Sequence, residues 1–117
     1  MGYLNDLATR TYEACKARGF HSGEPKVGDF CANLHGEVSE LWEAYRNNTF
    51  DMFCNKAEKM IELGIDPPLS CAEEELADII IRALDMAKAF NIDIDRAVEA
   101  KEKYNATRSF RHGGKKA

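Results

Sequence analysis

Two pairs of acidic residues with helical spacing are the features of this chain best suited to chemistry. Glu37 and Glu40 lie in the segment LHGEVSELWEAYR, and Glu75 and Asp78 lie in EEELADIIIRALDMA. Because residues three apart share one face of an α-helix, each pair places two carboxylates side by side. Each pair also borders an apolar stripe of its own helix. The two stripes comprise Leu34, Val38, Leu41 and Tyr45, and Ile79, Ala83, Met86 and Phe90.

The matching positions of the two pairs predict a cation site. If the two stripes pack together, four carboxylates meet at the rim of the core, where they repel one another and cost stability unless a cation neutralises them. Hard oxygen ligands with no His or Cys among them favour Mg²⁺, which Mn²⁺ can replace. Either pair alone would be more typical of a solvated helix edge. The same offset on two helices favours the metal site.

A basic and amide-bearing helix face near the end of the chain is the second candidate for chemistry. The apolar face of a helix expected over about residues 93–107 continues inward through Lys101, Tyr104, Asn105 and Arg108. Two interpretations stand side by side. Lys101 and Arg108 either form structural ion pairs with the four acids, or they bind phosphate oxygens while Asn105 hydrogen-bonds a sugar, base or phosphate.

Three further residues lie where they can serve the same site. Asn33, one helical turn before Glu37, either reaches a nucleobase or is an ordinary polar residue of a helix face. Arg82, one turn after Asp78, is expected to form a salt bridge with Asp78. His21, with its neighbour Phe20, lies in a loop between helices and is a weaker candidate for lining a base pocket.

The elements that must position these residues are helical almost throughout, with no convincing alternating strand. Gly19, Gly64 and the Pro67–Pro68 pair interrupt the pattern, and Ser70 with Glu73 forms a capping box. The fold class is therefore all-α: a four-helix-bundle-type domain with an additional short helix between the two acid-bearing helices. The helices are expected over about residues 3–18, 29–46, 52–63, 70–90 and 93–107.

Composition limits the class of protein and its partners. A chain of 117 residues is expected to form one domain over residues 1–117, and its net charge of −4 argues against a nucleic acid polymer as partner. No apolar run approaches the roughly 20 residues that span a bilayer, and no signal-peptide core is present, so a cytoplasmic protein without membrane contact is expected. The four cysteines form no Cys-x-x-Cys pair and are expected to be small buried hydrophobes. A basic tail with Arg111, Lys115 and Lys116 is either solvated or closes over a polyphosphate.

The paired motifs, the run EELADIIIRALDMA and the terminal EKYNATRSFRHGGK together resemble the MazG-like all-α nucleotide pyrophosphohydrolases. These enzymes are related in fold to dimeric dUTPases and phosphoribosyl-ATP pyrophosphatases, and the resemblance covers the chain from about Gly19 to its end. It implies hydrolysis of a nucleoside triphosphate to the monophosphate and pyrophosphate, in nucleotide-pool house-cleaning. It also implies a homodimer or homotetramer whose sites often borrow residues from a neighbouring subunit. The implied Mg²⁺ ligands are Glu37, Glu40, Glu75 and Asp78.

Several alternatives stay open from the sequence. Glu37 or Glu40 would act as the general base, and Glu74, next to Glu75, competes for the place of the third ligand. The segment 47–69 either caps the pocket or builds a subunit interface. A di-iron carboxylate bundle fails because no Glu-x-x-His pair is present. A non-catalytic helical module for nucleotide sensing or protein interaction is the alternative function.

Overall fold

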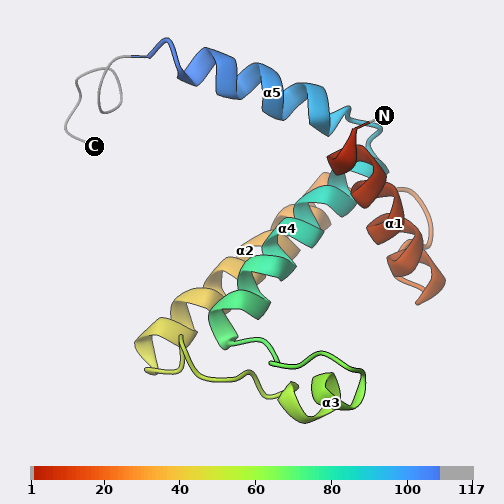
Figure 1. Ribbon diagram of the computed structural model, residues 1–117. Helices are drawn as coiled ribbons and strands as arrows, with labels where there is room; N and C mark the ends of the chain where they lie inside the picture. The colour runs from red at the N-terminus through yellow and green to blue at the C-terminus, as the bar shows by residue number, and fades with distance from the viewer. Residues whose placement is uncertain (1, 109–117) are drawn as a thin grey trace.

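The computed structural model describes residues 2–108 and contains five helices there (Figure 1). They are α1 (Tyr3–Ala17), α2 (Val27–Arg46), α3 (Ala57–Glu62), α4 (Cys71–Ala89) and α5 (Ile94–Asn105). The predicted all-α class is confirmed, with one isolated bridge between Phe53 and Ser70. Helix α3 is shorter than the predicted 52–63 because that bridge and a turn occupy residues before it. The basic tail with Arg111, Lys115 and Lys116 lies outside the described residues.

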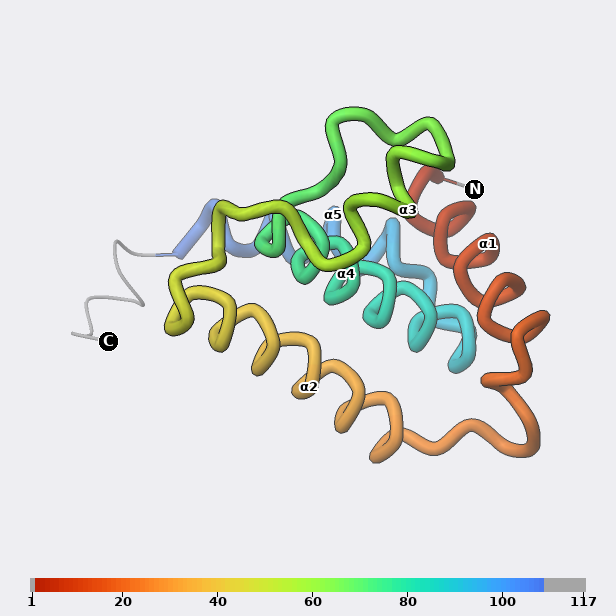
Figure 2. Tube along the Cα trace, turned by 90° about the horizontal axis from the view of Figure 1, so that it is seen from below, coloured from red at the N-terminus to blue at the C-terminus, as the bar shows by residue number. Residues whose placement is uncertain are grey.

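Helices α2 and α4 lie antiparallel and side by side, and α1 packs against α4 (Figures 1 and 2). Helix α4 is therefore the central element of the described chain. It begins as predicted at a capping box, in which Ser70 Oγ accepts from the Glu73 backbone N–H and the Glu73 carboxylate accepts from the Ser70 N–H. Both groups would otherwise be unsatisfied at a helix start, so the box fixes the register of the acids that follow.

Helices α1 and α5 cap each other's first turns. The carboxylate of Asp95 accepts hydrogen bonds from the backbone N–H groups of Leu4 and Asn5, at 3.1 and 2.8 Å. In return, the Asn5 side chain donates to Asp93 and accepts from the Ile94 N–H. These bonds join the helix starts, while the remainder of α5 projects away from the α2–α4 pair (Figure 1).

The buried core of the described chain is small. Its buried apolar residues are Ala8, Cys15, Ala44, Cys54, Ala72, Leu84 and Ala87. Only Leu84 among them has a large side chain, whereas an α2–α4 core lined by both predicted stripes would bury several. The cysteines divide accordingly: Cys15 and Cys54 are buried as expected, but Cys71 is half-buried and Cys31 is exposed.

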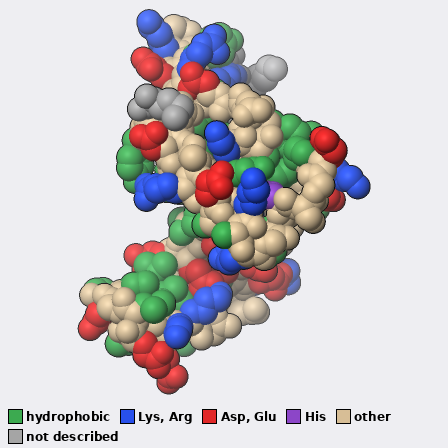
Figure 3. Space-filling view, turned by 90° about the vertical axis from the view of Figure 1, so that its right-hand side faces the viewer, with side chains coloured by type: hydrophobic (Ala, Val, Ile, Leu, Met, Phe, Trp, Pro, Cys, Tyr) green, Lys and Arg blue, Asp and Glu red, His purple; other side chains and the backbone are tan. Residues whose placement is uncertain are grey.

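Large apolar side chains of α2 and α4 remain exposed. In the α2 stripe Val38 is 51% exposed and Tyr45 61%, whereas Leu34 and Leu41 are half-buried; outside the stripes, Trp42 is 57% exposed and Ile80 54%. Apolar side chains also reach the surface in the lower part of the molecule, where α3 lies (Figure 3). An apolar surface of this extent is typical of a face that another protein surface covers. In residues 2–108, no helix is long and apolar enough to cross a membrane.

Candidate metal centre

The antiparallel pairing of α2 and α4 brings the two acidic motifs together. Oxygen atoms of Glu37, Glu40 and Glu75 lie within 4.8 Å of one another, and so do oxygen atoms of Glu74, Glu75 and Asp78. Glu75 belongs to both groups and therefore joins the two helices' acids. The side chain of Glu37 is only 12% exposed, while Glu40 lies at the surface. The predicted four residues thus form one cluster, with Glu74 beside it.

The cluster makes ionisation of its members costly. Burial and the neighbouring Glu40 and Glu37 raise the pKa of Glu75 to about 7. Burial and the charges of Glu37 and Glu74 raise the pKa of Asp78 as well. Raised carboxyl pKa values are the expected result of removing like charges from water and placing them together. In the absence of a cation, Glu75 therefore keeps its proton up to about neutral pH.

Two basic side chains partly neutralise the cluster. Arg82 Nε lies 3.5 Å from Glu37 Oε1, which corrects the expectation that Arg82 pairs with Asp78. Lys56, just before α3, forms an ion pair with Glu74. Burial alone would raise the pKa of Glu74, but Lys56 and Cys54 lower it below its ordinary value. The charge of Glu74 is thus already neutralised by Lys56. Its neighbour Glu75 is the acid that lies close to Glu37 and Glu40 of α2.

Two buried oxygen atoms in the cluster have no hydrogen-bond partner within the described part of the chain. They are Glu37 Oε2 and Glu75 Oε2, one from each helix. A buried carboxylate oxygen without a partner costs free energy comparable to a lost charged hydrogen bond, which a metal ion would recover. Among residues 2–108, these five carboxylates have Lys56 and Arg82 as their ion-pair partners, so the ionised acids carry excess negative charge there. An all-oxygen donor set with this charge fits a hard divalent cation such as Mg²⁺.

A cavity of about 570 Å³ opens beside the cluster. Glu40, Glu74 and Glu75 line one side of it. The segment 47–69 supplies the opposite wall, including Lys56 and the amides of Asn47 and Asn55. This volume falls within the range of about 300–1,000 Å³ that small-molecule sites occupy. Of the two roles considered for the segment, lining a pocket is the one these contacts support.

Lys56 is the residue at this site that the sequence alone did not single out. It precedes α3 by one position, in a segment whose only clear pattern is apolar. Its hydrogen bond with Glu74 raises the lysine's pKa, so it stays charged at neutral pH. No spacing rule links Lys56 to Glu74, because the contact depends on how the chain turns at residues 49–56. The signal that could have pointed to Lys56 is Glu74, a buried acid that needs a basic partner, but its burial becomes known only from the fold.

A second cavity, of about 120 Å³, lies on the other side of Arg82. Asn33 and Arg82 line it together with Phe20, His21 and Phe30. The loop between α1 and α2 therefore does form part of a pocket, and Asn33 faces it. The polar, lysine-bearing cavity thus borders the cluster directly, and the smaller cavity with aromatic side chains is linked to it through Arg82, which pairs with Glu37.

The basic face of α5 does not reach the cluster within one chain. Lys101, Tyr104, Asn105 and Arg108 are all exposed, and among the described helices α5 packs chiefly against α1. Lys101 Nζ instead lies 4.9 Å from the centre of the Tyr104 ring. Within residues 2–108, neither Lys101 nor Arg108 forms an ion pair, so the predicted inward orientation of this face is wrong for a single chain.

Comparisons with known proteins give no match: no family model, no curated protein and no solved structure matches this chain. The assignment of a function therefore depends on the chemistry of the site and on the resemblance of its motifs.

Proposed function

We propose that this protein hydrolyses a nucleoside or deoxynucleoside triphosphate to the monophosphate and pyrophosphate, with Mg²⁺ held by Glu37, Glu40, Glu75 and Asp78. The observation that carries the proposal is the pair of buried carboxylate oxygens without partners, Glu37 Oε2 and Glu75 Oε2, inside a four-acid cluster. Such atoms destabilise a fold unless a proton or a cation neutralises them, and a divalent cation can serve acids of both helices at once. The resemblance to MazG-like enzymes adds the reaction class, and nucleotide-pool house-cleaning is its expected physiological setting.

The residues have distinct roles in this proposal. Bound Mg²⁺ would supply charge neutralisation for the triphosphate and would activate a water molecule. Glu37 is held by Arg82 and is largely buried, which suits a fixed ligand. Glu40 is exposed and faces the larger cavity, so we assign it the removal of the water's proton. Lys56 lies in the same cavity, where its ammonium group can contact phosphate oxygens.

The base would insert at the mouth of the smaller cavity, which Arg82 also lines, while the sugar would stay outside it. Asn33 offers an amide there that can both donate and accept hydrogen bonds with a base. Phe30 and Phe20 provide flat apolar faces for stacking. This placement spans the molecule from polar to aromatic surroundings, as the triphosphate and base of a nucleotide require.

We also propose that the active form is a homodimer or homotetramer. The exposed apolar face of α2 includes an apolar depression of about 360 Å³ lined by Val38, Leu41, Trp42, Tyr45 and Phe50. A second copy of the chain would cover it and add the core that one chain lacks. The α5 face with Lys101, Tyr104, Asn105 and Arg108 would then serve the cluster of a neighbouring copy.

The experiment that tests this function is a release assay on a panel of ribo- and deoxyribonucleoside triphosphates with and without Mg²⁺. We expect pyrophosphate and a monophosphate to form in equal amounts, and only when metal is present. In Asp78→Asn the rate of release should fall at least about a hundredfold. Glu13→Gln, an exposed acid on α1, is the matched control and should retain full activity. Tight nucleotide binding without turnover would instead support the non-catalytic sensing module.

A further inference from the structure

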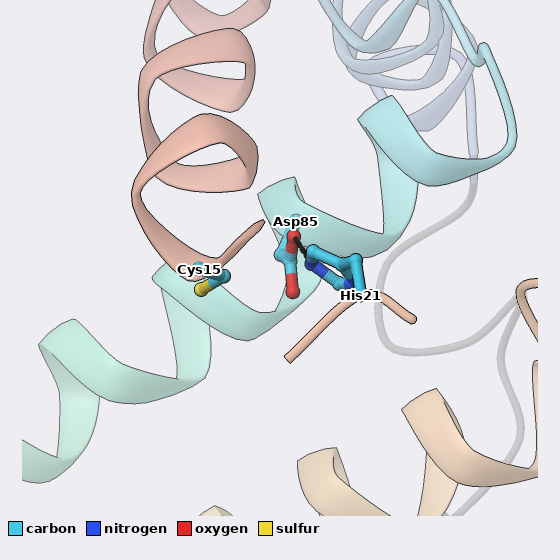
Figure 4. A group of neighbouring side chains, drawn as sticks. All are labelled: Cys15, His21 and Asp85. Atoms are coloured by element: carbon cyan, nitrogen blue, oxygen red, sulfur yellow. Dashed lines mark hydrogen bonds and ion pairs between the residues drawn. The ribbon is translucent and has the colours of Figure 1, made fainter. Parts of the chain in front are cut away.

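A second group of potential metal donors lies apart from the carboxylate cluster. Cys15 on the last turn of α1, His21 in the following loop and Asp85 on α4 lie close together, and His21 and Asp85 point toward one another (Figure 4). Their sulfur, nitrogen and oxygen donor atoms all lie within 4.8 Å of one another. His21 Nε2 is 2.7 Å from Asp85 Oδ1, and Asp85 lies between the other two side chains.

The chain is folded locally so as to bring these donors together. Gly19 takes a φ of +87°, and the N–H groups of Phe20 and Gly19 bond back to the carbonyls of Cys15 and Lys16. This Schellman motif ends α1 and turns the chain back toward α4. His21 is then held between the ring of Tyr12, stacked at 4.5 Å, and that of Phe30 at 5.8 Å. The donor positions are therefore fixed by helix ends and packing as well as by the His21–Asp85 bond.

Burial makes this group unusual. Cys15 is 5% exposed, and the side chains of His21 and Asp85 are 12% and 5% exposed. A buried Asp needs a strong partner, which His21 supplies in the metal-free protein. Cys15 has only a long contact, 3.8 Å from Arg18 Nη2 to its sulfur. The site thus combines a protected thiol, an imidazole and a carboxylate, the three donor types that bind zinc in proteins.

We propose that Cys15, His21 and Asp85 form a Zn²⁺ site with one open coordination position. Zinc bound at about 2.0–2.3 Å to N, O and S donors in a tetrahedron requires donors roughly 3.3–3.8 Å apart. The His21–Asp85 pair would open slightly and Cys15 would move inward, both small side-chain adjustments. His21 and Asp85 also line the cavity of about 120 Å³, so a water molecule can take the fourth position from that side. Zinc would join the end of α1 and the α1–α2 loop to α4.

The donor chemistry separates this site from the carboxylate cluster. Mg²⁺ prefers oxygen donors and binds thiolates poorly, whereas Zn²⁺ is well matched to sulfur and imidazole. A titration in millimolar Mg²⁺ therefore occupies the acidic cluster and leaves the Cys15 group for zinc. The zinc site borders the cavity that we propose for the base, so Zn²⁺ binding is measured without nucleotide, where hydrolysis plays no part.

The test uses the full chain, reduced with a non-coordinating reductant, in excess Mg²⁺. Zn²⁺ is titrated against a chromogenic chelator, and Co²⁺ is used as a spectroscopic probe because a thiolate ligand gives it a near-ultraviolet charge-transfer band. We expect one equivalent of Zn²⁺ and one equivalent of the cobalt band. The band should disappear in Cys15→Ser and persist in Cys31→Ser, the matched control at an exposed cysteine.

A second variant keeps the test decisive if Cys15→Ser fails to fold. Asp85→Asn retains an acceptor for His21 but removes the anionic ligand, and we expect zinc affinity to fall at least about tenfold, the lower end of what even outer-sphere partners contribute. Unchanged zinc affinity in Asp85→Asn would overturn the proposal. So would a wild-type protein without a stoichiometric cobalt–thiolate band, or a band that survives Cys15→Ser in a folded variant.

Discussion

Replacing Glu75 by Gln should stabilise the metal-free protein at pH 8 while removing its response to Mg²⁺. Glu75 has its pKa raised from 4.5 to about 7 by burial and by Glu40 and Glu37. The unfolded chain loses this proton near pH 4.5, but the folded chain keeps it until about pH 7. Between these values the folded state binds more protons, so its stability falls as pH rises. The raised pKa of Asp78 acts with the same sign.

The size of this stability loss follows from the shift in the pKa of Glu75. Each pKa unit is worth about 1.4 kcal/mol, so the shift sets an upper limit of about 3 kcal/mol on the loss in the free energy of unfolding. Because the side chain is only half-buried, solvent screening reduces the expected effect to on the order of 1–2 kcal/mol. Gln carries no charge at any pH, and its amide can donate to the neighbouring carboxylates as a protonated Glu75 would. The variant should therefore gain this amount at pH 8 and only a small part of it at pH 5, where the unfolded chain has just begun to lose its proton.

Urea unfolding gives the free energy of unfolding of each protein. It is measured at pH 5 and pH 8 with a chelator present, and again at pH 8 with excess Mg²⁺. The wild type should be less stable at pH 8 than at pH 5 without metal, and Mg²⁺ should restore it. Glu75→Gln should show a flatter pH dependence and no gain with Mg²⁺. Glu13→Gln controls for the loss of one surface charge. A destabilised Glu75→Gln at pH 8, or a pH dependence equal to that of the wild type, would refute the reasoning.

Three further predictions concern the surfaces around the site. Trp42→Asp places a charge on the exposed apolar face of α2 and should convert an oligomer to a monomer in light scattering; a wild type that is monomeric at tens of micromolar would contradict this. Lys101→Met should change stability by less than about 0.5 kcal/mol, because the residue is exposed, but lower kcat/KM about tenfold or more; unchanged kinetics would exclude a phosphate contact. Asp95→Ala removes the acceptor for two N–H groups of α1 and should cost about 1 kcal/mol in urea unfolding, and a neutral effect would show that water replaces the cap.

Local rules were sufficient to predict the helices and the acidic cluster. The capping box at Ser70 begins α4 where expected, and Gly19 ends α1. The three-residue spacing within each motif and the shared offset from an apolar stripe predicted that Glu37 and Glu75 lie close together, as they do in the structure. These features depend on helix geometry, which a sequence encodes over a few residues.

Features that depend on non-local contacts could not be predicted in the same way. Arg82 pairs across to Glu37 on α2 rather than with Asp78 on its own helix, because the choice depends on how α2 and α4 are placed. Lys56 reaches Glu74 through an irregular turn. The direction of α5 is determined by its capping contacts with Asn5 and not by its own apolar face, so the periodicity that suggested an inward basic face was misleading.

Direct titration of Mn²⁺, followed by electron paramagnetic resonance of the free ion, tests the central claim that the four acids bind a divalent cation. With a non-hydrolysable triphosphate analogue present, the wild type should remove at least one equivalent of Mn²⁺ per chain from the free signal. Glu75→Gln and Asp78→Asn should bind no more Mn²⁺ than the analogue alone, while Glu13→Gln should match the wild type. Equal Mn²⁺ binding by all four proteins, or none by the wild type at millimolar metal, would contradict the claim.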